Sequence, residues 1–284
     1  MALFDTPVRE VQHHARRAAN QASPAIQQLA RLGYAAKGVV YLIIGGVAAQ
    51  AAFSRAEQVQ GSEGALKTVL QQPFGKVLLG IMALGLAGFV VWRMVQAATD
   101  PEHKEGGAKR AFARIGYAMS GVLYAGLTLE AVRMLRGSGG GQGGGTAHWT
   151  AMVMDKPFGR VAVGLAGLGI VAYGIYQLIK AFKGDDLDKR LNLEGSAVAT
   201  RRRVVAVARA GTAARGVVFC IIGWLVIKAA MQYDPAEAQG LQGALVTLRD
   251  AAYGRYLLGL VALGLIAYGI TQLVKARYRV IRAT

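Results

Sequence analysis

The chain has 284 residues, of which 54% are hydrophobic and only 17% are charged. Soluble domains carry about 25% charged residues, so the composition excludes an ordinary water-soluble protein. A net charge of +17 would indicate nucleic-acid binding in a soluble chain. Here no base-stacking aromatic residues accompany the basic ones, and nucleic acid is not an expected partner.

Six apolar runs predict the main elements. Each run has about 20 residues, the length that a helix needs to cross roughly 30 Å of hydrocarbon. In chain order the runs cover about 33–53, 76–98, 114–134, 160–182, 204–230 and 255–276. The sequence therefore predicts an all-α integral membrane protein with six transmembrane helices.

Two motifs divide these helices into three repeats. The first, Ala-Arg-x-Gly-[Tyr/Thr]-x-x-x-Gly-Val, begins at Ala30, Ala113 and Ala208. The second, [Pro/Ala]-[Phe/Tyr]-Gly-[Lys/Arg], begins at Pro73, Pro157 and Ala252. Because the interval between the motifs is constant to within one residue, we expect a structural unit that occurs three times. The unit is a hairpin of two helices, and we expect the three tandem hairpins in a pseudo-threefold arrangement.

The repeats set the predicted domain boundaries. The chain begins with a basic leader, for which a short helix on the inner membrane surface and disorder both stay open. The leader covers residues 1–28, repeat 1 covers 29–98, a linker 99–112, repeat 2 113–182, a basic linker 183–203, and repeat 3 with a basic tail 204–284.

Glycines recur every five residues in the second helix of each repeat, as at Gly75, Gly80 and Gly85. Five residues advance a helix by about 140° net, so these glycines wind around it and predict close neighbours on several sides. A semi-apolar segment too short to span the membrane precedes each of these helices, and predicts a brief helix at the outer interface. These segments lie at 65–70, 148–154 and 244–249, and the glycine-rich stretch 137–145 predicts a flexible outer connection.

Basic residues set the predicted topology. Six spans place both termini on one side of the membrane, and that side also holds most of the 33 Lys and Arg residues. By the positive-inside rule, both termini are expected in the cytoplasm. Anionic lipid headgroups of the inner leaflet are the expected partners, and the sequence leaves open whether the protein forms a homo-oligomer.

No motif for catalysis, metal binding or a cofactor is found, so no enzyme activity and no cofactor is predicted. The four His residues lie outside the spans, and the single cysteine, Cys220, lies inside the fifth. Glu130 is the one acidic residue within an apolar run. With Arg133 three residues later it is interpreted as a local ion pair, in preference to a functional intramembrane carboxylate.

Polar residues that recur near the inner helix ends form the candidate site. Tyr34, Lys37 and Tyr41 share one face of the first helix of repeat 1. Phe89, Arg93 and Gln96 share one face of its second helix, and the other repeats have comparable residues at the equivalent positions. The candidate residues for binding an anion or a lipid are Arg31, Tyr34, Lys37, Arg93, Arg114, Tyr117, Gln177, Arg209, Arg215 and Gln272.

Two interpretations of these residues stay open. In the first, the arginine of each first motif and the lysines reach the inner interface, and the tyrosines form an aromatic belt. In the second, Lys37, Arg93 and Arg215, which lie a turn or more deeper, point inward. Burying charge there costs several kcal/mol unless an anion, a phosphate headgroup or a water-filled vestibule satisfies it.

The triplicated motif pair resembles the bacterial membrane family catalogued as domain of unknown function 1206, over about residues 28–280. The third repeat departs from the pattern, with Thr212 in place of tyrosine and Ala252-Tyr253 in place of Pro-Phe. The resemblance implies a multi-pass protein of the bacterial inner membrane with three two-helix repeats, and it carries over no catalytic residue. We expect a non-enzymatic protein that binds or passes a small anionic species or lipid at its cytoplasmic basic cluster. The alternative is a non-catalytic membrane scaffold or partner-interaction protein.

Overall fold

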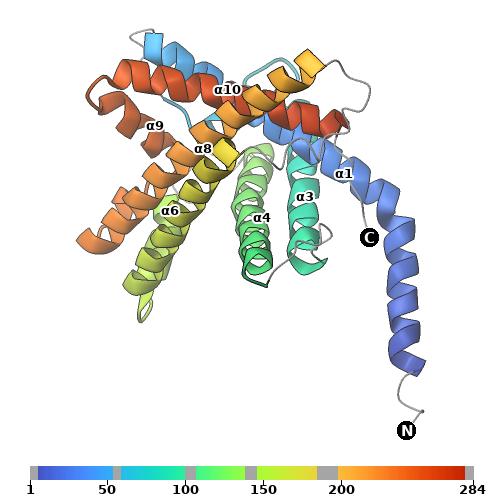
Figure 1. Cartoon of the computed structure of the whole chain (residues 1–284). Coiled ribbons are helices and arrows are strands. Elements are labelled where there is room, and N and C mark those ends of the chain that lie inside the picture. The colour runs from blue at the N-terminus through green and yellow to red at the C-terminus, as the bar shows by residue number, and fades with distance from the viewer. Residues whose placement is uncertain (1–5, 54–58, 100–106, 138–145, 184–197, 279–284) are drawn as a thin grey trace.

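The computed structural model describes residues 6–53, 59–99, 107–137, 146–183 and 198–278 (Figure 1). Every regular element in these ranges is a helix, which confirms the all-α prediction. The predictions for linker residues 100–106 and 184–197, and for most of the glycine-rich stretch, lie outside the described residues.

Each repeat contains two long helices with a short helix between them. Repeat 1 holds α1 (Thr6–Phe53), α2 (Ser62–Leu70) and α3 (Gly75–Thr99). Repeat 2 holds α4 (Gly107–Leu135), α5 (Thr146–Met154) and α6 (Gly159–Lys183). Repeat 3 holds α8 (Val198–Gln232), a single turn η1 (Pro235–Glu237), α9 (Leu241–Asp250) and α10 (Gly254–Tyr278). The three short helices were expected, whereas leader residues 6–28 continue α1 instead of forming a separate helix.

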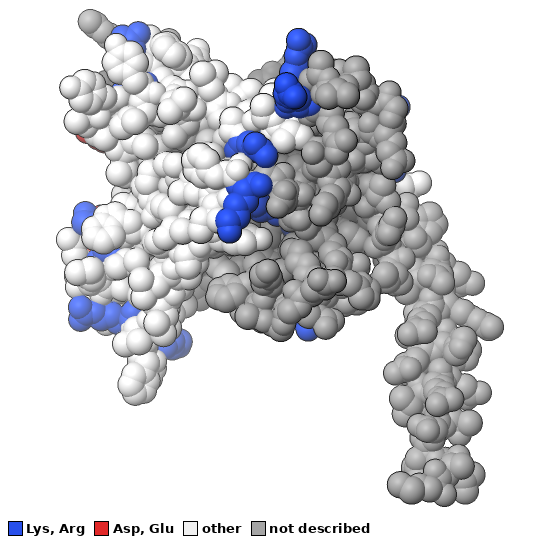
Figure 2. Space-filling model, viewed as in Figure 1, with Lys and Arg blue, Asp and Glu red and all other residues white. Residues whose placement is uncertain are grey.

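Five of the described helices are long and apolar enough to cross a membrane: the part of α1 from Arg31, and α3, α6, α8 and α10. α4 covers the sixth expected span but does not belong to these five. Near its C-terminal end, Arg133 Nη1 lies 3.9 Å from Glu130 Oε2, the expected local ion pair. Among the residues that Figure 2 does not draw in grey, uncharged ones predominate, and Lys and Arg form a few separate patches.

An aromatic residue with a left-handed backbone conformation precedes the second long helix of every repeat. Phe74, Phe158 and Tyr253 have φ values of 59°, 62° and 60°. The glycine that follows each is required by space, because a Cβ atom there would overlap the carbonyl oxygen of Leu70, Val153 or Arg249. The second motif therefore encodes a tight turn, and these helices begin at its glycine, one residue before the predicted apolar runs.

The second helix of each repeat packs against the first helix of the next. α3 packs on α4, α6 on α8, and α10 returns to α1. Within repeats, α1 packs on α3 and α8 on α10, but among residues 116–135 and 159–183 no comparable packing joins α4 to α6. Figure 1 shows α6 running beside α8 and diverging from α4.

Glycines mark these helix contacts, as the sequence predicted. On α10, a Cβ atom at Gly264 would overlap the Ala214 side chain of α8, and one at Gly269 would lie 2.9 Å from the Gly38 carbonyl oxygen of α1. α10 thus has close neighbours on two sides. On α6, however, a Cβ atom at Gly169 would have no neighbouring atom within 4 Å, so that helix departs from the prediction.

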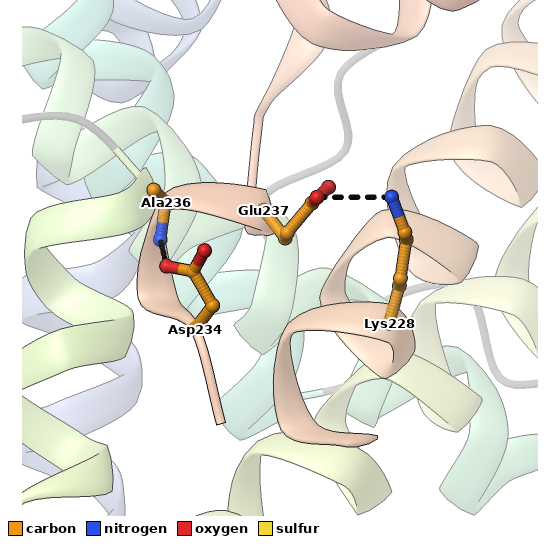
Figure 3. Close-up of polar contacts among 4 residues, drawn as sticks. All are labelled: Lys228, Asp234, Ala236 and Glu237. Carbon is orange, nitrogen blue, oxygen red and sulfur yellow. Dashed lines mark hydrogen bonds and ion pairs between the residues drawn. The ribbon is translucent and has the colours of Figure 1, made fainter. Parts of the chain in front are cut away.

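Polar contacts fix the C-terminal end of α8. Lys228 Nζ donates to Glu237 Oε1 at 2.9 Å, and the Ala236 amide donates to Asp234 Oδ1 at 2.9 Å (Figure 3). Arg160 of α6 donates through Nε to the Ala230 carbonyl at 2.6 Å, in the last turn of α8. A guanidinium on a helix carboxyl end satisfies carbonyls that have no partner within the helix, and here it joins α6 to α8.

Candidate functional site

Lys37 lies where the three repeats meet. Its side chain is buried, with the residue 1% exposed. The Nζ atom lies 4.7 Å from the ring centroid of Phe89, 4.5 Å from that of Tyr124 and 5.5 Å from that of Tyr268. One ring comes from each repeat, so the ammonium group of α1 is held by aromatic faces of α3, α4 and α10.

Two arginines share rings with Lys37. The guanidinium carbon of Arg215 lies 5.0 Å from the Tyr268 centroid, and Nη1 donates to the Tyr268 hydroxyl at 3.0 Å. The guanidinium carbon of Arg93 lies 4.9 Å from the Phe89 centroid, and its Nη1 donates to Gln96 Oε1 at 2.8 Å. The three cations therefore form one cluster linked through common aromatic rings.

Six aromatic rings surround these cations in three edge-to-face pairs. The centroid separations are 4.9 Å for Phe89–Tyr124, 5.2 Å for Tyr173–Phe219 and 4.7 Å for Tyr41–Tyr268. Each pair joins the second helix of one repeat to the first helix of the next, at equivalent sequence positions. We refer to Lys37, Arg93, Arg215 and these six rings as the central cluster.

The positive charge of the central cluster finds no counter-charge among the residues that the structure describes. Within the described part of the chain, none of its three cations forms an ion pair. Five buried side-chain atoms also find no protein hydrogen-bond partner, and every one of them can donate a hydrogen bond. They are Trp92 Nε1, Arg93 Nε, Gln96 Nε2, Ser120 Oγ and Arg215 Nε.

Aromatic faces offset only part of the cost of this charge. A desolvated cation–π contact contributes about 2 kcal/mol, whereas removing an ion from water costs several kcal/mol even after relaxation of the protein. Three such ions near one another add mutual repulsion. The arrangement is therefore suited to a ligand that supplies negative charge and hydrogen-bond acceptors together.

The candidate residues divide into two groups by depth. Arg31, Arg114 and Arg209 are exposed, and Arg114 donates through Nε to the Ala97 carbonyl at 2.6 Å, in the last turn of α3. These three fit the interface interpretation. The residues that the fold brings to or beside the central cluster are Tyr34, Lys37, Arg93, Tyr117, Gln177, Arg215 and Gln272.

The list of candidate residues left out three polar residues of this region: Trp92, Gln96 and Ser120. Ser120 is the repeat 2 equivalent of Lys37 and Arg215, and it is 6% exposed. The triplicated position gave a signal for it, but nothing in the sequence showed that its hydroxyl group would lack a partner. No cluster of metal-binding side chains occurs among the residues that the structure describes.

Comparison with known proteins identifies the repeat. The family model described as Domain of Unknown Function (DUF1206) matches three stretches of the chain, residues 32–100, 115–184 and 210–279. The chain belongs to the DUF1206 family. The three matches coincide with the three helical hairpins, so each hairpin is one DUF1206 repeat.

A relative aligns with nearly the whole chain. The chain is 33% identical over 263 residues to the "Uncharacterized protein YxxB" of Bacillus subtilis (strain 168), which covers 91% of this chain and 93% of the relative. No solved structure matches the chain.

Proposed function

We propose that this DUF1206 protein crosses the bacterial inner membrane six times with both termini in the cytoplasm. Its three repeats surround a pseudo-threefold axis, and the central cluster binds or passes an anionic group of the phosphate class. That group belongs either to a small soluble anion or to a lipid headgroup, and it reaches the cluster from the cytoplasmic side.

The aromatic pairs support the pseudo-threefold arrangement. The pairs Phe89–Tyr124 and Tyr173–Phe219 have equivalent positions, and Tyr268 with Tyr41 completes the set by joining repeat 3 to repeat 1. A chain of hairpins that did not return on itself would leave the last pair unformed. The sixth span, α4, follows from its length and from the matching DUF1206 repeat.

The observation that carries the proposed activity is the uncompensated charge at Lys37. Buried ions in membrane proteins are paired, line aqueous cavities or mark ligand pathways. Here the unpaired donors of Arg93 and Arg215 accompany Lys37, and a phosphate-class anion presents several acceptor oxygens to such donors. The same geometry offers no advantage to a cation.

Binding measurements test the proposal directly. Purified protein is titrated with inorganic phosphate by equilibrium dialysis, and its retention of phosphatidylglycerol is compared with that of phosphatidylcholine by native mass spectrometry. We expect at least one phosphate-bearing probe to bind. Lys37→Met and Arg215→Met should each weaken binding at least tenfold, because each removes a desolvated positive charge.

Exposed arginines on the same helices provide matched controls. Arg31→Met on α1 and Arg209→Met on α8 remove equal charge outside the central cluster and should leave binding within about twofold, as for solvent-screened charges. Failure of the wild-type protein to bind either probe would overturn the proposal and favour the scaffold function. Equal losses in the control and cluster variants would overturn it as well. Anion flux into liposomes then separates binding from passage.

A further inference from the structure

The hairpin of repeat 2 is open where the hairpins of repeats 1 and 3 are closed. In repeat 1 a Cβ atom at Gly33 of α1 would lie 2.8 Å from the Gly85 carbonyl oxygen of α3. In repeat 3 a Cβ atom at Gly264, the equivalent of Gly85, would overlap Ala214 of α8. In repeat 2 a Cβ atom at Gly116 would meet only the Tyr173 ring edge at 3.5 Å, and one at Gly169 would meet nothing within 4 Å.

Side-chain exposure shows the same difference. Leu123 of α4 is 54% exposed, whereas its equivalents Val40 and Val218 are 1% and 2% exposed. On α6, Ala166 and Gly169 are exposed as well. Repeat 2 thus has an apolar opening between α4 and α6, whereas the equivalent helices of the other repeats pack together.

The opening leads to the central cluster. At its inner end Tyr117 of α4 lies 5.2 Å from the guanidinium carbon of Arg93, and Tyr173 of α6 lies 5.9 Å from that of Arg215. In repeat 2, Ser120 stands where the other repeats have a lysine and an arginine. Its side chain is shorter than theirs, and its buried hydroxyl lacks a protein partner.

Charge and polarity together define the occupant. One end of the opening presents positive charge and unpaired donors, and the other presents aliphatic and glycine surface one to two turns nearer the bilayer centre. An anion with an attached hydrocarbon chain fits both ends. A second copy docking through the same face would bring no anion, because Glu130 is the one acidic residue in the described stretches 116–135 and 159–183, and it pairs with Arg133.

We infer that the opening between α4 and α6 admits an anionic phospholipid from the membrane. Its phosphate lies against the central cluster, and an acyl chain lies along Leu123 and Gly169. The inference rests on the proposed function and deepens it, since it names the membrane as the source of the anion.

Bulky substitutions in the opening test this inference. Gly169→Trp and Leu123→Trp place a large side chain where the acyl chain lies, and a Cβ atom at Gly169 would meet no protein atom within 4 Å. Retention of phosphatidylglycerol is measured by native mass spectrometry of full-length protein extracted from vesicles that contain it. Binding of glycerol phosphate, the soluble headgroup analogue, is measured in parallel, and the thermal midpoint verifies folding of each variant.

Leu168→Trp on the same helix is the matched control, because Leu168 is 57% exposed and its equivalents Leu84 and Leu263 are 67% and 57% exposed in the closed repeats. We expect at least a tenfold loss of retained phosphatidylglycerol in both opening variants, with no change in glycerol phosphate binding or in the control.

Three outcomes would overturn the inference. Unchanged lipid retention in the folded opening variants would exclude the opening as the route. Glycerol phosphate binding as tight as that of the lipid would identify an aqueous source while leaving the proposed function standing. A change from dimer to monomer caused by Leu123→Trp would assign the opening to a second copy. If neither ligand bound wild-type protein, the proposed function itself would fail.

Discussion

Lys37 shows how one residue can oppose stability and support function. Its ammonium group contacts three aromatic rings, yet the nearby charged groups that act on it are Arg215, Arg93 and Lys275, all cationic. Without a ligand, this lysine lowers the stability of the fold. Natural proteins accept such a cost at binding sites, where the ligand offsets it.

Replacement of Lys37 by methionine should therefore stabilise the unliganded protein. Methionine has similar length and keeps contact with the rings, while the desolvation cost disappears. We expect the free energy of unfolding to rise by about 1 kcal/mol or more, seen as a higher thermal midpoint in detergent after lipid removal. Arg31→Met, at an exposed position, should leave the midpoint unchanged. A large fall for Lys37→Met would show instead that the cation holds the rings together.

The aromatic-glycine turn is a second residue-scale feature, and it is structural. A Cβ atom at Gly75 would overlap the Leu70 carbonyl oxygen, whereas one at Gly80, in the same helix, would have nothing within 4 Å. Gly75→Ala should therefore destabilise the protein by about 3 kcal/mol or more. Gly80→Ala should be neutral or stabilise it by up to about 1 kcal/mol, because alanine favours the helix. Thermal unfolding of the two variants side by side checks the difference, and equal midpoints would contradict the geometry of the turn.

At the scale of elements, the helices and their boundaries could be predicted, but their neighbours could not. Apolar runs, motif spacing and the short segments each predicted a helix that the structure contains. The pairing of α6 with α8 and of α10 with α1 depends on contacts across repeats, which periodicity does not encode. The open hairpin was also unpredictable, since Gly116 and Gly169 match the glycines that close the other two repeats.

Alanine substitutions at equivalent glycines measure that difference. Gly264→Ala should cost about 1–3 kcal/mol of stability, because the new methyl group would overlap Ala214 of the neighbouring helix. Gly169→Ala, at the same position in repeat 2, meets no atom within 4 Å and should cost nothing. The thermal midpoints of the two variants provide the comparison. A similar loss at both positions would mean that α4 and α6 close together in the membrane as the other hairpins do.

For the whole molecule, the sequence predicted where the charged residues lie along the helices, but it did not separate those buried in the bundle from those at its surface. Motif repetition located Lys37, Arg93 and Arg215, and their depth suggested burial. The same reasoning assigned Arg114 to the candidate site, although it caps α3 at the surface. A helical wheel gives direction relative to one helix, and only the assembled bundle decides whether that direction meets lipid, water or another repeat.

Membrane orientation is the remaining property of the whole molecule, and it decides which leaflet the central cluster faces. With both termini in the cytoplasm, Lys37 faces the inner leaflet, where bacterial anionic lipid is accessible to it. The reverse orientation would place it toward the outer surface.

In a background with Cys220→Ser, single cysteines at Thr284 and at Gln242 of α9 are treated with a membrane-impermeant maleimide. We expect the cysteine in place of Gln242 to react in intact cells, and that in place of Thr284 to react only after permeabilisation, as the excess of Lys and Arg on the side of the termini requires. The opposite labelling pattern would exclude a cytoplasmic route to the cluster.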